Sequence, residues 1–194
     1  MDAGRALDQR GWVPATSGNF SVRLDDGDLA ITASGNHKGR LKPEHIMQVS
    51  LDGQPRDSKR PSAETALHLQ IYRREPEVAA VLHTHSVSAT IASMGQATTL
   101  RFSDLEILKA FAPIQTHQAS ISVPVFPNNQ DIDQLAATVE GFMATNGTGY
   151  AYLIRGHGVY TWGKTIDDCQ RHLEALEFLF EYYRLTADAN RTTP

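Results

Sequence analysis

The chain has 194 residues, of which 41% are hydrophobic, and its formal net charge at pH 7 is −4. This length fits one domain with a sizeable core, so we expect a single domain over residues 1–194. The net negative charge does not indicate binding to nucleic acid or to an anionic membrane surface. No apolar stretch has the length of a membrane span, and the polar start Met1–Arg5 is unlike a signal peptide.

The first part of the chain predicts short strands and helices in alternation. An initial helix is weak, and two strands of alternating polarity flank the turn Asp25–Asp28. The apolar run Val78–Leu82 predicts a buried strand that ends at His83. The elements predicted before this run are a helix over 4–10, strands over 19–24, 29–32 and 47–51, and a helix over 62–74.

The second part of the chain predicts more helix, and its last helix is the best defined. Thr165 can cap the N-terminus of this helix, whose apolar residues recur at spacings of three and four. Cys169 lies in that apolar stripe, so we expect packing from its thiol; a lone cysteine also suits a reducing cytoplasm. The other predicted elements are helices over 86–94, 103–111 and 132–144, and strands over 121–126, 150–154 and 158–162.

Short hairpins combined with long helices indicate an α/β domain in which helices cover a mostly antiparallel sheet.

Three histidines follow apolar runs. His83 and His85 are two residues apart, so on an extended strand both imidazoles point to the same side and can face one metal ion. His157 follows the run Tyr150–Ile154 and lies between two glycines, which permit a close approach of the backbone. A lone His-x-His pair also fits a surface coincidence, but three neutral imidazoles around one open position are typical of a catalytic zinc site.

Three loops are rich in small polar residues: 16–19, 32–36 and 60–63. Backbone amides at glycine turns, together with Ser, Thr and Asn side chains, provide the several small donors that a phosphate group needs. Ser62 also lies at a predicted helix start, where anions are favoured. Each loop by itself fits ordinary turn chemistry, so this interpretation requires the three loops to meet.

Two carboxylates, Glu64 and Glu106, lie near the histidines in the sequence. Because a helical glutamate is usually solvated, neither residue indicates catalysis by itself.

Five segments occur in the order seen in the class II aldolase and adducin family. They are Ser17–Ser21, Ile31–Gly35, Pro61–Glu64, His83–His85 and Gly156–Gly158. The chain resembles that family over roughly residues 11–185. Further segments, 11–19, 33–39 and 105–110, are similar to the family's dehydratase branch, the zinc lyases that act on a methylthio-substituted ketose phosphate in methionine salvage.

The resemblance implies a three-layer αβα fold with a central, mainly antiparallel sheet. It also implies a homotetramer whose active sites lie between neighbouring subunits. His83, His85 and His157 match the family's ligands for Zn2+, one ion per subunit.

The resemblance assigns two more sets of residues. Glu64 matches the carboxylate that the family's aldolases use as metal ligand or acid/base, and Glu106 matches the one to which its dehydratases assign proton transfer. The positions that match those binding the phosphate of a small sugar substrate are Asn19, Ser34, Gly35 and Ser62.

Metal and phosphate motifs suit more than one reaction. A metal ion that binds a 2-keto sugar phosphate stabilises the charge formed by loss of the C3 proton, and equally the charge formed by cleavage of the C3–C4 bond. When the C3 proton is lost first, departure of the C4 hydroxyl completes a dehydration. Cleavage of the C3–C4 bond is instead an aldol cleavage. We expect a dehydratase, while Pro61–Glu64 keeps a sugar-phosphate aldolase or epimerase open as the alternative. A non-enzymatic adducin-like domain has no need of three zinc-type histidines.

Overall fold

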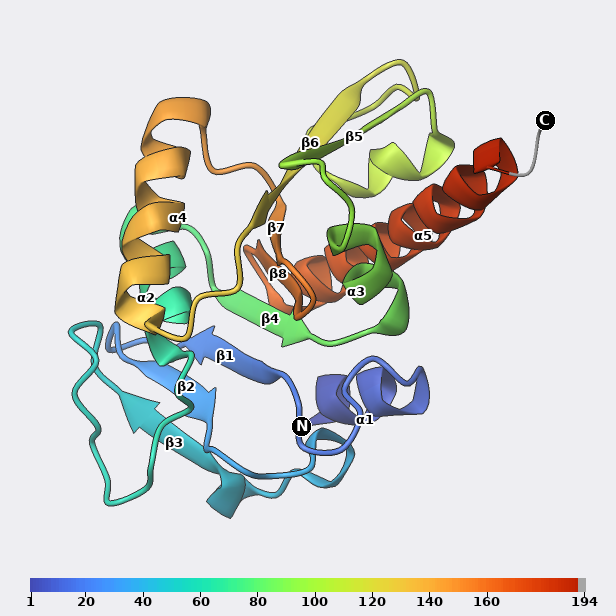
Figure 1. Cartoon of the computed structure of the whole chain (residues 1–194). Coiled ribbons are helices and arrows are strands. Elements are labelled where there is room, and N and C mark those ends of the chain that lie inside the picture. Colours follow the sequence, from blue (N-terminus) through green and yellow to red (C-terminus); the bar gives the residue numbers. More distant parts are fainter. Residues whose placement is uncertain (192–194) are drawn as a thin grey trace.

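An eight-stranded sheet runs through the centre of the computed structural model, which describes residues 1–191 (Figure 1). The strand order is β3-β2-β1-β4-β8-β7-β6-β5, and neighbours are antiparallel except the parallel pair β6–β7. The expected mainly antiparallel sheet is therefore confirmed. The strands are β1 (Asn19–Arg23), β2 (Leu29–Thr32), β3 (Ile46–Val49), β4 (Ala80–Thr84), β5 (Thr99–Ser103), β6 (Ser120–Phe126), β7 (Ala151–Ile154) and β8 (Gly158–Gly163).

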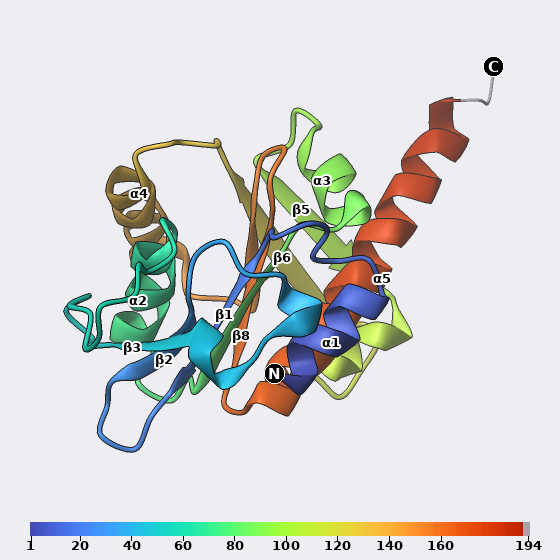
Figure 2. The same cartoon turned by 90° about the horizontal axis from the view of Figure 1, so that it is seen from below.

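Helices cover both faces of this sheet, which confirms the three-layer αβα architecture (Figures 1 and 2). One apolar core lies between the sheet and α2 with α4, and the other lies between the sheet and α1, α3 and α5. The α-helices are α1 (Asp2–Gln9), α2 (Thr65–Arg74), α3 (Val87–Ser93), α4 (Ile132–Asn146) and α5 (Ile166–Arg191), and the 3-10 helices are η1 (Lys38–Arg40), η2 (Pro43–His45) and η3 (Glu106–Ala110).

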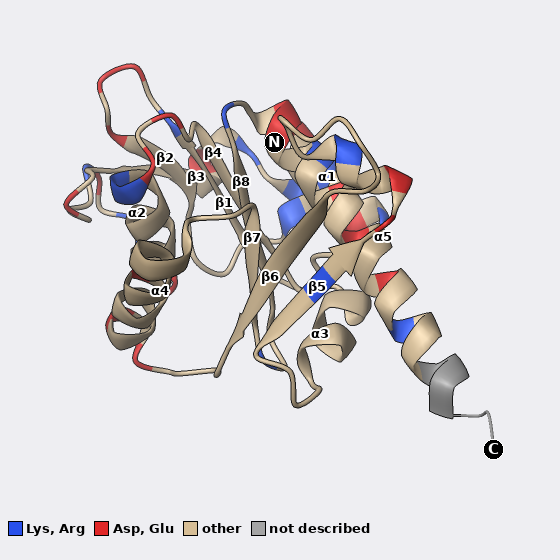
Figure 3. Ribbon diagram, turned by 90° about the horizontal axis from the view of Figure 1, so that it is seen from above, with Lys and Arg blue, Asp and Glu red and all other residues tan. Residues whose placement is uncertain are grey.

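The middle strands are apolar throughout because both of their faces are covered. In β4, Ala80 and Leu82 contribute to one core and Val81 contributes to the other. Strands buried on both faces read as continuous apolar runs, as this one does in the sequence. Charged residues accordingly lie mainly on the helices and loops around these strands (Figure 3). Among the described helices, none combines the length and apolarity needed to cross a membrane.

The predicted cap and apolar stripe of the last helix are confirmed. The Asp168 amide donates a hydrogen bond to Thr165 Oγ1 at 3.0 Å. Helix α5 begins at Ile166, the residue after Thr165. Cys169, Leu173 and Leu176 on the stripe are fully buried. The thiol of Cys169 therefore packs in the core, as expected.

The predicted helix over 103–111 is wrong. Residues up to Ser103 belong to β5, whose alternate residues Leu100 and Phe102 are buried, and the following turn is the 3-10 helix η3. Between them, Asp104 has φ 59°, a left-handed conformation that neither strand nor helix continues. Apolar spacings of three, which a 3-10 helix also satisfies, account for the error.

Candidate active site

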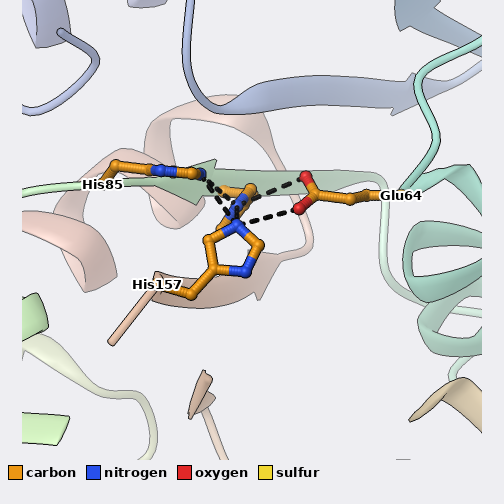
Figure 4. A group of neighbouring side chains, drawn as sticks. Glu64, His85 and His157 are labelled. Carbon is orange, nitrogen blue, oxygen red and sulfur yellow. Dashed lines mark hydrogen bonds and ion pairs between the residues drawn. The ribbon is translucent and has the colours of Figure 1, made fainter. Parts of the chain in front are cut away.

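Four side chains converge at the end of β4: Glu64, His83, His85 and His157 (Figure 4). Their ligand atoms all lie within 4.8 Å of one another. The three imidazole Nε2 atoms are closer still, at 2.8 Å, 3.1 Å and 3.3 Å. His83 belongs to β4 and His85 follows it, Glu64 is the residue before α2, and His157 lies in the turn between β7 and β8. We call these four residues the metal group.

Two glycines let other segments approach the end of β4. A Cβ at Gly158 would lie 2.0 Å from the Thr84 carbonyl oxygen, and one at Gly18 would lie 2.6 Å from the His83 carbonyl oxygen. Neither distance is possible for real atoms. The turn that carries His157 and the loop before β1 therefore need glycine here to pack against β4.

His83 is held in one orientation by two contacts. It is fully buried; its Nδ1 donates a hydrogen bond to the Val159 carbonyl at 2.9 Å, and its ring stacks on that of Tyr160 at 4.0 Å. With the proton on Nδ1, the Nε2 lone pair faces the metal group, which is the form that binds a metal.

Burial also keeps the imidazoles neutral. It lowers the pKa of His83 well below the ordinary value, and it lowers the pKa of His85 to about 4, assisted by His157 and Lys38. Neutral histidines are the ones that coordinate metal ions.

Glu64 completes the metal group with a carboxylate. Its Oε1 lies 2.9 Å from His157 Nε2 and its Oε2 lies 3.4 Å from His83 Nε2. Burial by itself would raise the pKa of this carboxyl, but positive charge on His83 and His157 when they are protonated, together with hydrogen bonds from His157 and the Asn19 amide, outweighs burial and holds the pKa well below its ordinary value. Glu64 is therefore ionised at neutral pH.

This donor set fits a divalent transition metal. Three imidazole nitrogens with a carboxylate are typical ligands of zinc, and Nε2 atoms about 3 Å apart can all turn a lone pair to one cation when each ring carries its proton on Nδ1. The four residues therefore form a possible metal-binding group.

A cavity of about 240 Å³ adjoins the metal group and shares Glu64 and His85 with it. The three glycine- and serine-rich loops meet there. All four residues that the family resemblance assigned to the phosphate line this cavity: Asn19, Ser34, Gly35 and Ser62.

Asn19 connects the cavity to the metal group. Its Nδ2 donates to Ser62 Oγ at 3.1 Å and to Glu64 Oε2 at 2.5 Å, and its Oδ1 accepts a hydrogen bond from His68 Nε2. Because an amide oxygen only accepts, His68 carries its proton on Nε2, and its Nδ1 accepts from Ser21 Oγ at 2.7 Å.

His68 does not belong to the metal group. Its position behind Asn19 was not predicted. Its spacing in the sequence could have indicated this position. His68 lies four residues after Glu64, and residues four apart lie on the same face of a helix.

Comparisons with known proteins identify the family. Residues 1–184 match the family described as the class II aldolase and adducin N-terminal domain. The chain belongs to the class II aldolase and adducin family. A relative from Methylococcus capsulatus, named methylthioribulose-1-phosphate dehydratase, is 55% identical over 181 residues, which cover 93% of this chain and 89% of the relative. A relative of the same name from Marinobacter nauticus is 53% identical over 186 residues, covering 93% and 88%.

The fold of the class II aldolase family is also found among solved structures. The L-fuculose-1-phosphate aldolase of Thermus thermophilus superposes with a TM-score of 0.77 at 28% identity, covering 100% of this chain and 94% of that one. The αβα prediction is thereby supported independently of the sequence relatives.

The other carboxylate that the family resemblance singled out, Glu106, lies apart from the metal group. It is on η3, its side chain is exposed, and it forms an ion pair with Lys109 at 2.6 Å. It does not line the cavity of its own chain. Arg101 also lies outside the cavity, on β5, where it donates to Ser120.

Proposed function

We propose that this protein is a zinc-dependent methylthioribulose-1-phosphate dehydratase. It would remove water from 5-methylthioribulose 1-phosphate to give 5-methylthio-2,3-dioxopentyl phosphate in methionine salvage. The observation that carries the proposal is the identity of about one half, over nine-tenths of the chain, to relatives of that name. The metal group and the adjoining cavity support it, because a phosphorylated ketose needs both. The reducing environment that suits the free Cys169 favours the cytoplasm as its location.

Each part of the site has a task in this reaction. His83, His85 and His157 would hold the zinc ion, which when bound acts as a Lewis acid toward the substrate's oxygens. The ionised Glu64 lies against two of these imidazoles, so it can serve as a further ligand or accept a proton next to the ion. The Ser62 hydroxyl accepts hydrogen bonds from Asn19 and from the Glu64 amide, which leaves its own proton for the phosphate.

Proton transfer by Glu106 requires a second subunit. Because Glu106 lies outside the metal group and cavity of its own chain, we propose that η3 of one subunit reaches the metal group of a neighbour in a homotetramer. The exposure of the Glu106 side chain supports this arrangement, since a group that acts across an interface must be accessible in the isolated chain.

Product analysis tests the reaction. The purified, zinc-loaded protein is incubated with 5-methylthioribulose 1-phosphate, and the products are identified by mass spectrometry and NMR. We expect a product lighter than the substrate by one water. The presence of Glu64 in the metal group favours a class II sugar-phosphate aldolase or epimerase as the second candidate. Cleavage of L-fuculose 1-phosphate without any dehydration product would select that alternative.

Mixing two inactive variants tests the shared site. Glu106→Gln keeps the shape of the side chain but cannot transfer a proton, and His83→Ala disrupts the metal group. In a mixed assembly about one quarter of the sites regain both intact residues when they come from different subunits. If both residues served the same chain's site, the mixture would stay inactive, which would exclude the proposed role of η3.

A further inference from the structure

Lys38, the first residue of η1, is a buried cation. Its side chain is 2% exposed, and its Nζ donates hydrogen bonds to the carbonyl oxygens of Thr16 and Asn36, each at 2.7 Å. It forms no ion pair with any carboxylate among the side chains that the structure describes. Burying an ammonium group without a counter-charge in contact with it is costly, so its location favours an anion bound beside it.

The ammonium group lies on the wall of the phosphate cavity. Its two carbonyl partners belong to two of the three loops that form this cavity, and Lys38 itself lines it. An ammonium has three donors, and two are used, which leaves one N–H for a ligand. Ser17 Oγ, on the same wall, is buried and has no hydrogen-bond partner within the described part of the chain.

We propose that Lys38 and Ser17 bind the doubly charged phosphate group of the substrate, with Lys38 as its counter-charge. This inference rests on the proposed function for the identity of the phosphate ester. Of the described residues that line the cavity, Glu64 is the one carboxylate and Lys38 the one lysine or arginine. Without Lys38, the phosphate dianion would contact only neutral donors and would lie near the negative charge of Glu64.

The charge of Lys38 is present at neutral pH. Burial lowers the pKa of this amine to about 8, while Glu64 opposes the decrease. The amine is therefore mostly protonated at pH 7, and a bound phosphate would favour that form further. A charge-assisted hydrogen bond from a preplaced ammonium is stronger than one from a hydroxyl.

A pair of variants tests the counter-charge. Lys38→Met removes the charge and keeps the chain length, and Lys42→Met is the matched control, because Lys42 is exposed and lies outside the cavity. Calorimetric titration of the zinc-loaded protein with inorganic phosphate should show about 10- to 100-fold weaker binding for Lys38→Met and no change for Lys42→Met. Binding of the unphosphorylated sugar methylthioribulose should be equal in all three proteins.

Lys38→Met could also fail to fold, since Lys38 ties two loops together, so a second measurement uses the unmodified enzyme. With 15N-labelled lysine, the Lys38 ammonium signal, assigned with Lys38→Arg, should shift as inorganic phosphate is added and stay in place with methylthioribulose. An unmoved signal at saturating phosphate, absence of phosphate binding, or equal phosphate binding by Lys38→Met would overturn the proposal. None of these readouts depends on turnover. A protein that binds phosphate through Lys38 but does not dehydrate the substrate would therefore refute the proposed reaction and leave the proposed role of Lys38 standing.

Discussion

The amide of Asn19 has one productive orientation at the candidate site. With Nδ2 toward Glu64, the amide donates a hydrogen bond to the carboxylate; rotated by half a turn, it would place an oxygen lone pair against a negative charge. His68 Nε2 donates to Oδ1 and so selects the first orientation. His68 is thus a positioning residue for Glu64, although it contacts neither the metal group's imidazoles nor the cavity.

Replacing His68 should therefore affect the metal group. His68→Leu removes the donor to Asn19 and should lower zinc affinity or kcat by about 10- to 100-fold, the range found when outer partners of metal ligands are removed. Zinc affinity is measured by competition with a chelator, and kcat by dehydration of the substrate. Circular dichroism verifies that the variant is folded.

Tyr72→Phe is the matched control for this prediction. Tyr72 OH lies 2.9 Å from Ser21 Oγ at the far end of the same chain of hydrogen bonds, so its loss leaves the contact between His68 and Asn19 in place. We expect little change in zinc affinity. Wild-type affinity in His68→Leu, or an equal loss in both variants, would show that the orientation of Asn19 does not depend on His68.

The sequence could predict which histidines lie together, because local geometry decides their positions. His83 and His85 could be paired because residues two apart on a strand point to the same side. His157 could be added because it follows a second buried strand. Lys38 and His68 could not be assigned, since their partners lie on other segments and only the folded chain brings them together. The catalytic role of Glu106 stays a prediction, because it depends on a neighbouring subunit.

At the scale of a single element, helix α5 contains a buried acidic side chain. Glu177 faces α3, is 5% exposed, and its Oε1 has no hydrogen-bond partner among the described residues. Burial raises the pKa of its carboxyl to about 7, the charge of Glu181 acts in the same direction, and Ser86 opposes them. The folded chain therefore binds this proton more tightly than the unfolded chain, so the stability contribution is complete below about pH 4.5 and is lost as the pH rises toward 7 and above.

Glu177→Gln should remove this pH dependence. We expect the variant to be more stable than wild type by about 3 kcal/mol at pH 8.5, from about 1.4 kcal/mol per unit for a pKa raised from 4.5 to about 7, and by less than about 1 kcal/mol at pH 5. Urea denaturation at the two pH values measures the free energy of unfolding. A gain of equal size at both pH values would mean that the carboxyl is not the cause.

Elements whose apolar pattern has one interpretation were predicted more accurately than elements whose pattern is ambiguous. The stripe at spacings of three and four in α5 fits a helix alone, and the continuous apolar run at β4 is too short for a buried helix of ordinary length. Around Leu105 and Leu108 the pattern covers barely two turns, so spacing could not distinguish an α-helix from the strand and 3-10 turn that form there.

For the molecule as a whole, α3 and α5 pack against each other (Figure 1), and both expose large apolar side chains. Val87 is 71% exposed, Met94 62% and Phe178 54%. Ile91, Tyr182 and Leu185 on the same two helices are also exposed. Large exposed apolar side chains are typical of protein–protein contacts, so these residues support the proposed tetramer.

Phe178→Glu should weaken the assembly, because a charge would have to be buried at the contact. Light scattering after size-exclusion chromatography should give a tetramer mass for wild type and a smaller mass for the variant, with a parallel loss of activity if Glu106 acts across the interface. Ala144→Glu, on the exposed surface of α4 across the sheet, is the control and should remain tetrameric. An unchanged mass for Phe178→Glu would place the contact elsewhere.

The position of the metal group in the middle of the sheet has a kinetic consequence. His83 pairs with Asn19 of β1 on one side and with Tyr160 of β8 on the other, so the ligands meet only after segments from opposite ends of the chain have joined β4. Contacts between such distant segments form late in folding. Zinc therefore has no assembled site in the early stages: its presence should leave the refolding rate nearly unchanged and slow unfolding, so that the ion prolongs the lifetime of the native chain without guiding its formation.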